Sequence, residues 1–164
     1  MLKPPFHPSN ILLAAKQKKK TYVSLAKNLK KMQPRLLDEY VHELHEKVFE
    51  EINCLDCGNC CRTLGPRITS KDIEKMAKAT GKKEAAFIQE YLRIDEDQDY
   101  VFKSMPCPFL QADNICQIYP SRPKACREYP HTDRKKFFQL IDLSLENTKT
   151  CPAVQKIFDQ LGQV

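Results

Sequence analysis

The sequence lacks any apolar run approaching the roughly 18 residues that a membrane-spanning helix requires, so it predicts no transmembrane segment. Near the N-terminus, the short apolar stretch 11–15 comes before the lysine-rich residues 16–20, whereas a secretory signal has its positive charges first. We therefore expect a cytoplasmic protein. No Ser-His-Asp set, phosphate-binding loop or pair of carboxylates stands out, which leaves a bound metal as the basis for any reaction.

Acidic residues are absent from residues 1–37, which carry nine Lys or Arg, whereas residues 38–164 carry eighteen basic and twenty-one acidic residues. The net charge of +6 therefore comes from the N-terminal segment, as +9 against −3. Such a segment binds nucleic acid, an anionic membrane surface or an acidic partner, or it is simply a solvated extension. The sequence favours the solvated extension, because a charge run alone is a weak signal.

The length and composition are typical of a globular protein. A chain of 164 residues buries a core without cross-links, and 41% hydrophobic residues with 29% charged residues is a globular composition. Apolar residues at helical spacing predict a helix from Thr21 to Pro34, a second after Pro34, a capped helix that stops at Gly81, and helices over 84–93 and 152–161. In the second of these, His42 and His45 lie off or beside the apolar stripe, so we expect them at the surface.

The region after the acidic loop 95–99 is less regular. The runs YVFKSM (100–105) and ICQIY (115–119) predict a small irregular hairpin, joined through two prolines and the Asp113-Asn114 turn. A brief helix follows between Pro123 and Pro130, and residues 137–143 are either strand or helix. We expect a mostly helical α+β protein, with a basic helical extension at 1–49 and a small, irregular cysteine-rich domain at 50–164 that contains the hairpin.

Eight cysteines dominate the candidate chemistry, four of them in the run CLDCGNCC at 54–61. The candidate metal ligands are Cys54, Cys57, Cys60, Cys61, Cys107, Cys116, Cys126 and Cys151. Thiolates in Cys-X-X-Cys spacing point at one ion, and this spacing occurs twice over 54–60. Cys60 and Cys61 project in different directions because they are adjacent, so either one is not a ligand or they serve two sites.

Two other interpretations of the cysteines are weaker. A disulfide framework fits the even number but neither the expected compartment nor the adjacent pair. A thiol-redox enzyme with a catalytic Cys-X-X-Cys normally has a βαβ context, which is missing here. Metal ligation is the favoured interpretation, because so many closely spaced thiols would otherwise be a reactive liability in the cytosol.

The cysteine segments together resemble a known family. CLDCGNCC, PCPFL at 106–110, CQIYPSRPKACREYP at 116–130 and the late CP at 151–152 are similar to the YkgJ-like cysteine-cluster family, the CxxCxxCC proteins described as zinc- or iron-chelating domains. The resemblance covers about residues 54–152 and implies metal binding by the cysteines. Members of this family are often labelled iron-sulfur oxidoreductases, mostly without a defined reaction. A similar module accompanies flagellin lysine methylation enzymes, where an iron-sulfur cluster is implied. Residues 1–49 lie outside the resemblance.

All-thiolate ligation suits both zinc and iron-sulfur clusters. The run Cys54-X-X-Cys57-X-X-Cys60 resembles the first three ligands of a bacterial four-iron site, and Cys151-Pro152 resembles the distant cysteine-proline that completes such a site. Zinc fingers more often have two separated Cys-X-X-Cys pairs. The spacing therefore favours one or two iron-sulfur clusters, of the [4Fe-4S] type, with zinc as the alternative.

Polar residues surround the later cysteines. They are Tyr119, Arg122, Lys124, Arg127, Tyr129 and His131. Cations there either offset the negative charge of a metal-thiolate centre or tie the segment together through carbonyls and acids such as Glu128 or Asp133. His131 is an alternative ligand or acid-base group, although eight thiols leave it no obvious place.

Two functional hypotheses follow. In the first, an iron-sulfur protein has a redox or metal-dependent enzymatic role, resembling an oxidoreductase of unknown reaction, and its basic helix recruits a protein or substrate. In the second, a noncatalytic zinc module docks nucleic acid or an acidic partner through residues 1–37. No sequence-specific recognition motif accompanies that segment.

Overall fold

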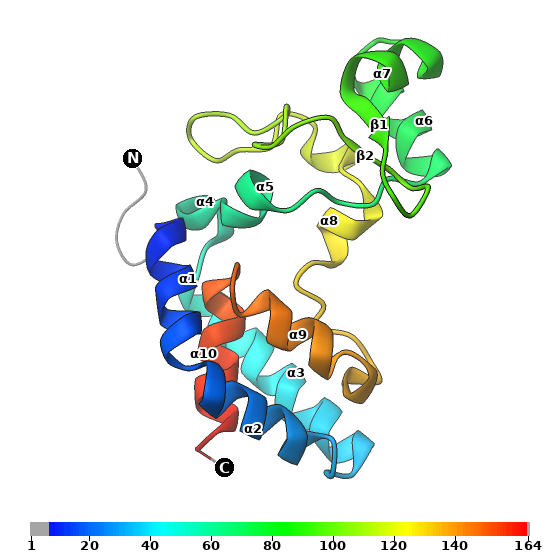
Figure 1. The fold of residues 1–164 in the computed structure, drawn as a ribbon. Helices are drawn as coiled ribbons and strands as arrows, with labels where there is room; N and C mark the ends of the chain where they lie inside the picture. Colours follow the sequence, from blue (N-terminus) through cyan, green and yellow to red (C-terminus); the bar gives the residue numbers. More distant parts are fainter. Residues whose placement is uncertain (1–6, 164) are drawn as a thin grey trace. The chain divides into compact units, whose positions relative to one another are not determined.

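The structure is a computed structural model that describes residues 7–163 (Figure 1). The chain forms two compact units. The described part of the first unit consists of residues 7–59 and 130–163, and the second unit consists of Cys60–Tyr129. Lys3, one basic residue of the N-terminal segment, lies outside the described residues. No helix within 7–163 is long and apolar enough to cross a membrane. The division expected at residue 49 stays a prediction.

The first unit is helical wherever it is regular. Its elements are α1 (Pro8–Gln17), α2 (Lys19–Leu29), α3 (Pro34–Glu51), α4 (Cys54–Cys57), the 3-10 turn η2 (Phe137–Gln139), α9 (Ile141–Asn147) and α10 (Pro152–Leu161). Pro8, Pro34 and Pro152 open their helices at a position where the missing N–H costs nothing. The helices predicted after Thr21, after Pro34 and over 152–161 are confirmed. The prediction did not include α1, because its apolar stretch was too short to show a helical period.

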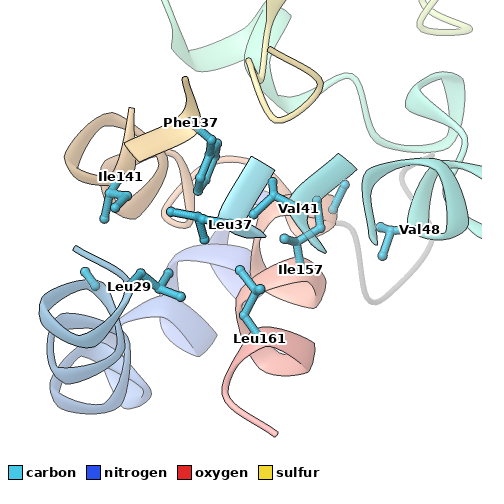
Figure 2. Close-up of a cluster of buried hydrophobic side chains, with 10 residues drawn as sticks. Leu29, Leu37, Val41, Val48, Phe137, Ile141, Ile157 and Leu161 are labelled. Carbon is cyan, nitrogen blue, oxygen red and sulfur yellow. The ribbon is translucent and has the colours of Figure 1, made fainter. Parts of the chain in front are cut away.

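The core of the first unit joins segments from both ends of the described chain (Figure 2). Leu37, Val41 and Val48 of α3 meet Ile157 and Leu161 of α10, and all five are at most 5% exposed. Burying an aliphatic side chain of this size contributes about 1.5–3 kcal/mol. Helix α10, the last in the chain, is therefore essential to the unit that α3 begins.

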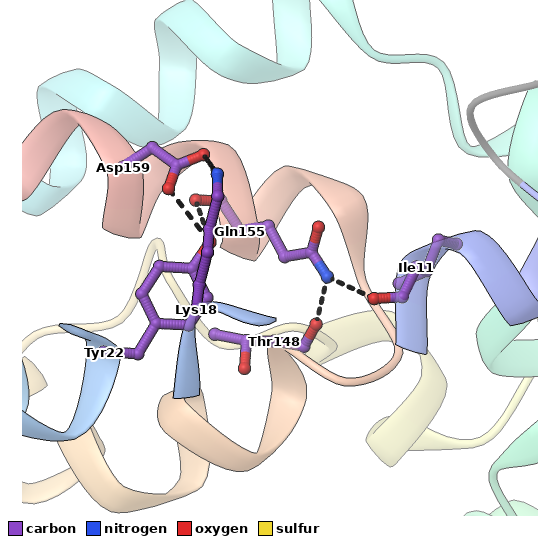
Figure 3. Close-up of polar contacts among 6 residues, drawn as sticks. All are labelled: Ile11, Lys18, Tyr22, Thr148, Gln155 and Asp159. Carbon is purple, nitrogen blue, oxygen red and sulfur yellow. Dashed lines mark hydrogen bonds and ion pairs between the residues drawn. The ribbon is translucent and has the colours of Figure 1, made fainter. Parts of the chain in front are cut away.

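Polar contacts fasten the basic N-terminal helices to α10 (Figure 3). Asp159 accepts hydrogen bonds from Tyr22 Oη at 3.0 Å and from Lys18 Nζ at 2.6 Å. The Gln155 side-chain amide donates to the carbonyls of Ile11 and Thr148, both at 2.7 Å. The described part of the basic segment is thus packed into the first unit, with its apolar face buried.

The second unit contains the only strands in the described residues. Its elements are α6 (Ser70–Ala79), α7 (Glu84–Tyr91), β1 (Leu92–Ile94), β2 (Tyr100–Phe102), the 3-10 turn η1 (Tyr119–Ser121) and α8 (Lys124–Glu128), while α5 (Asn59–Thr63) spans the boundary between the units. Helix α6 begins with a capping box, in which Thr69 and Asp72 bond reciprocally, and the chain leaves it through Gly81 at φ 66°. The predicted capped helix before Gly81 and the predicted helix 84–93 are confirmed, with the second ending two residues early.

The hairpin forms between different segments from those predicted. Residues 100–102 are a strand, but they pair in antiparallel register with β1, as Leu92 opposite Phe102 and Ile94 opposite Tyr100. The run ICQIY contributes only the isolated bridge between Leu110 and Cys116 and then turns into η1. The acidic loop 95–99 is therefore the turn of the hairpin, a much shorter connection than the one through the prolines. The mostly helical fold with a single hairpin is as predicted.

A second apolar cluster lies beneath these elements. Phe87 and Met76 are fully buried, and the Phe87 ring stacks on Phe109 with their centroids 6.1 Å apart. Cys107 and Cys116 pack against the same cluster. The core of the second unit thus supports two of the candidate metal ligands directly.

Candidate metal centre

All eight cysteines lie in the described part of the chain, and the structure records none of them in a disulfide bond. The first unit holds three of the predicted ligands, which we call the first group: Cys54, Cys57 and Cys151. The second unit holds the other five, Cys60, Cys61, Cys107, Cys116 and Cys126. The disulfide interpretation therefore has no support in this structure.

The local sequence shapes the segment that carries Cys54 and Cys57. The Asn53 side chain caps α4 by accepting the Leu55 N–H at 2.9 Å, and Gly58 ends this one-turn helix in the left-handed conformation at φ 58°. A residue with a side chain adopts that conformation only at a cost, so Gly58 suits the tight turn between the first two Cys-X-X-Cys steps. Cys57 is buried, whereas Cys54 is exposed.

A buried asparagine joins this turn to the segment before Cys151. Asn59 is 2% exposed, and its side-chain N–H donates to the Thr150 carbonyl at 2.8 Å. Cys151 follows as the N-cap of α10. One hydrogen bond therefore brings cysteine segments 91 residues apart within reach of each other.

Backbone hydrogen bonds connect the cysteines of the second unit. The Cys107 N–H donates to the Cys61 carbonyl at 2.8 Å, and the Leu110 N–H donates to the Cys107 carbonyl at 3.1 Å. Leu110 in turn forms the bridge with Cys116. Three cysteine segments that are distant in sequence are thus fixed to one another through their main chains. We call Cys61, Cys107, Cys116 and Cys126 the second group.

Helix α8 supplies Cys126 and is held in place by a buried carboxylate. Asp72, 3% exposed on α6, accepts the Lys124 N–H at 2.9 Å, at the first turn of α8. The same carboxylate accepts the Thr69 N–H at 3.0 Å and the Thr69 hydroxyl at 2.7 Å. Asp72 therefore links the capping box of α6 to the helix that carries Cys126.

Burial controls the titration of most of the thiols. It raises the pKa of Cys107 to about 11 and those of Cys126 and Cys151 to about 12, and it also raises the pKa of Cys116. Negative charge on the other three thiols of the second group raises the pKa of Cys126 further. Charge on Cys54 and Cys57 acts on Cys151 in the same way.

Cys61 is the exception. A hydrogen bond with the Cys60 side chain lowers its pKa to about 7, against the effect of burial, and the charges of Arg62 and Arg122 act in the same direction as the hydrogen bond. Near neutral pH the metal-free second group therefore consists of one partly ionised thiol and three neutral ones. A bound cation lowers the thiol pKa values that burial raises, because the metal is ligated by thiolates.

The donor set fits a thiophilic metal, although the ligands are not assembled in advance. Four thiols in one compact unit are the ligand set of a structural zinc site or an iron-sulfur cluster. Within residues 7–163, however, no group of three or more His, Cys, Asp or Glu side chains is already arranged to hold a metal ion. Metal binding to such a protein is coupled to closure of the ligands.

The sequence analysis gave two roles for the polar residues around the later cysteines, tying the segment together or offsetting the charge of a metal-thiolate centre. Arg127 ties the segment together, since its guanidinium donates to the Arg122 carbonyl at 2.7 Å. Arg122 stacks on Tyr119, and its positive charge favours the ionised form of the Cys116 thiol. His131 belongs to the first unit, whereas the second group belongs to the second unit.

Sequence reasoning missed two residues and misplaced a third. Neither Asn59 nor Asp72 was singled out as organising the site, and only the capping-box pattern around Asp72 gave a usable signal. His45, expected at the surface, is half-buried and bonds the Thr132 hydroxyl at 2.8 Å, and burial lowers its pKa. No sequence period indicates that contact, because Thr132 is 87 residues away.

The fold and the grouped thiols define a mostly helical protein with a cysteine cluster of the metal-binding class. The family profile described as "CxxCxxCC: Putative zinc- or iron-chelating domain" matches residues 53–152, more than half of the chain. The chain belongs to this family. No curated protein and no solved structure matches it.

Proposed function

We propose that the protein holds metal at two centres, one served by the first group and one by the second, and that the bound species is an iron-sulfur cluster with a redox role. The chain of backbone hydrogen bonds from Cys61 through Cys107 and Leu110 to Cys116 carries this proposal, because it holds distant cysteines together independently of their titration. The Asn59–Thr150 hydrogen bond supports the first centre in the same way.

Iron is favoured over zinc by the first group. Cys54 and Cys57 lie on one short helix, and Cys151 stands at the N-terminus of α10, followed by Pro152. These three thiols correspond to three of the four thiolates of a four-iron site, including the distant cysteine-proline that completes it. An iron-sulfur cluster supplies one-electron transfer, and the chain's own residues ligate it, shield it from water and set the charge around it.

Metal analysis of groupwise variants tests the proposal. Protein purified without oxygen should be brown and contain iron and sulfide for two centres. Replacement of Cys54, Cys57 and Cys151 by Ser should remove about half of the metal, and replacement of the second group should remove the other half. Single Cys57→Ser and Cys107→Ser variants serve where a multiple variant fails to fold. Protein that contains no metal, or variants that lose none, would contradict the proposal.

Zinc is the second candidate, and the second group favours it on its own. Four thiols spread over one small unit are the ligands of a closed tetrahedral zinc site, which stabilises an irregular fold by binding. Colourless protein with stoichiometric zinc in both groups would replace the iron proposal with this one. Zinc in the second group alone would restrict the iron-sulfur cluster to the first.

The lysines of α1 and α2 give the zinc candidate a docking surface. Lys18 forms an ion pair with Asp159, and Lys30 forms one with Asp142. The remaining lysines of α1, α2 and the turn after α2 are exposed and form no ion pair within the described residues: Lys16, Lys19, Lys20, Lys27 and Lys31.

Binding of nucleic acid to these five lysines would weaken as salt rises, by a log–log slope of about −0.9 for each phosphate contact. Filter binding of duplex DNA between low and moderate salt measures this slope. Replacement of the five by Gln should abolish binding, and Lys103→Gln in the second unit is the control. Binding that is absent, or that does not change with salt, would contradict this role.

A further inference from the structure

Arg122 is held rigidly within the second unit. It follows η1, and its guanidinium carbon lies 3.7 Å from the centroid of the Tyr119 ring. Its carbonyl accepts the Arg127 guanidinium at 2.7 Å. The contact with the aromatic face and the hydrogen bond to the Arg122 carbonyl reduce the freedom of the long side chain, which lowers the entropy cost of using it.

The orientation leaves a buried donor. Arg122 Nε is inaccessible to solvent and has no hydrogen-bond acceptor among the described residues. A buried charged donor without an acceptor costs more than the roughly 1–3 kcal/mol of a neutral one, so a structure rarely keeps one unless it has a use. Thiolate sulfur is an acceptor for such an N–H group.

Backbone hydrogen bonds place Arg122 beside the segments that carry two thiols of the second group. The Tyr119 N–H donates to the Cys116 carbonyl at 3.1 Å, and the Cys126 N–H donates to the carbonyl of Pro123, the residue after Arg122, at 3.0 Å. Four thiolates around a divalent ion leave a net charge of about −2, which a buried site tolerates only with nearby cations or N–H donors. Arg62, the residue directly after Cys61, supplies a second cation.

We propose that Arg122 is a positioning residue for the metal centre of the second group, and that its buried Nε–H donates to a ligand thiolate while its charge offsets that of the centre. This inference rests on the proposed function and deepens it, since it names the residue that sets the electrostatics of one of the two centres. Tyr119 holds the guanidinium in place, and Arg127 holds the backbone behind it.

Titration of the reduced, metal-free full chain with Zn²⁺, in competition with a chelator, tests the proposal. Arg122→Gln should bind the Zn²⁺ of the second group about 10–100-fold more weakly, the usual range for residues that support metal ligands. Arg122→Lys keeps the charge but loses the planar donor, so its loss should be smaller. The matched control is Arg93→Gln, the same charge change at an exposed residue of β1, which should stay within about twofold of the parent.

Cobalt spectra distinguish a direct hydrogen bond from general destabilisation. In the Co²⁺-substituted protein, loss of an N–H donor to sulfur should move the sulfur-to-cobalt charge-transfer band of Arg122→Gln to longer wavelength, whereas Arg93→Gln should keep the parent band. If Arg122→Gln does not fold, Tyr119→Leu loosens the same guanidinium and should give a smaller shift in the same direction.

The outcomes separate this inference from the proposed function. A parent protein that binds neither Zn²⁺ nor Co²⁺ would overturn the proposed function itself. A parent that binds both, together with an Arg122→Gln variant of unchanged affinity and spectrum, would overturn only the role of Arg122. An equal loss in Arg93→Gln would also overturn it, because net charge alone would then explain the effect.

Discussion

The carboxylate of Asp72 on α6 accepts the main-chain N–H of Lys124 at 2.9 Å and so fixes the start of α8, the helix that carries Cys126. Helix α8 has only five residues, too few to be stable without tertiary contacts. Its orientation, and with it the position of one proposed ligand, therefore depends on a residue 52 positions earlier in the chain.

Replacing this carboxylate should weaken both the fold and the metal centre. We expect Asp72→Asn to lower the free energy of unfolding by about 1–3 kcal/mol, because an amide places an N–H group against the donors that the carboxylate accepts. Urea denaturation of the metal-free protein measures the change. Asp97→Asn, at an exposed position in the hairpin turn, is the control and should stay within about 0.5 kcal/mol of the parent. Equal stability of the two variants would show that the link is not stabilising.

The same carboxylate predicts a loss of stability in acid. Burial favours the neutral form of Asp72, but hydrogen bonds from Thr69 and Lys124 and the charge of Arg127 outweigh it, so the net effect lowers its pKa. A lowered folded-state pKa adds stability above the unfolded value of about 3.9, and this stability is lost as the pH falls through the folded value. Unfolding from pH 6 to pH 2 should therefore show a steeper decline below about pH 4 in the parent than in Asp72→Asn. Parallel curves would contradict this prediction.

Metal binding to the second group should release protons. Cys107, Cys116 and Cys126 are neutral at pH 8 because burial raises their pKa values, whereas Cys61, with a pKa of about 7, is already largely ionised. We therefore expect about three protons per Zn²⁺ at pH 8 and an affinity that rises with pH between 6 and 8. Calorimetry in buffers of different ionisation enthalpy measures the number, with Cys54, Cys57 and Cys151 replaced by Ser to isolate this group. Release of fewer than two protons would show that the thiols are ionised before the metal binds.

The contact between α2 and α10 should contribute measurably to the first unit. Tyr22 is 1% exposed, and its hydroxyl donates to Asp159, so removal of the hydroxyl loses a hydrogen bond to a charged group. We expect Tyr22→Phe to lower the free energy of unfolding by about 1–2 kcal/mol. Tyr40→Phe, at a more exposed position on α3, is the control and should be nearly neutral. Urea denaturation with circular dichroism distinguishes the two, and equal effects would contradict the prediction.

Sequence patterns predicted the helices well where a single face is buried. The stripes of α3 and α10 carry the core residues Leu37, Val41 and Ile157, so their spacing directly reflects the packing. The partner of β2 was predicted wrongly, because short aromatic runs carry no information about which neighbour they pair with. The turn residues of the acidic loop 95–99 were the better guide, since a strand pairs most readily across the shortest connection.

The cysteines were recognised from the sequence, but not their grouping. Spacing placed Cys54, Cys57 and Cys60 with Cys151, whereas the structure puts Cys54, Cys57 and Cys151 in the first unit and Cys60 in the second. Spacing could not show that Cys107 bonds Cys61 through the backbone, or that the pair Cys60 and Cys61 falls in the other unit from Cys57. Such contacts depend on long-range folding, which leaves no local pattern. The eight ligands themselves stay a prediction.

The first unit is formed by two segments that flank the second unit in the chain, so the two units can complete their folding at different times during synthesis. All four thiols of the second group have left the ribosome once residue 126 has emerged, so that unit can fold and capture its metal while synthesis continues. Helix α3 has no such opportunity, because Ile157 and Leu161 of its core are translated only after the whole second unit. Cys54 and Cys57 must wait for Cys151, and a nascent or truncated chain therefore exposes two early thiols to oxidants throughout that interval.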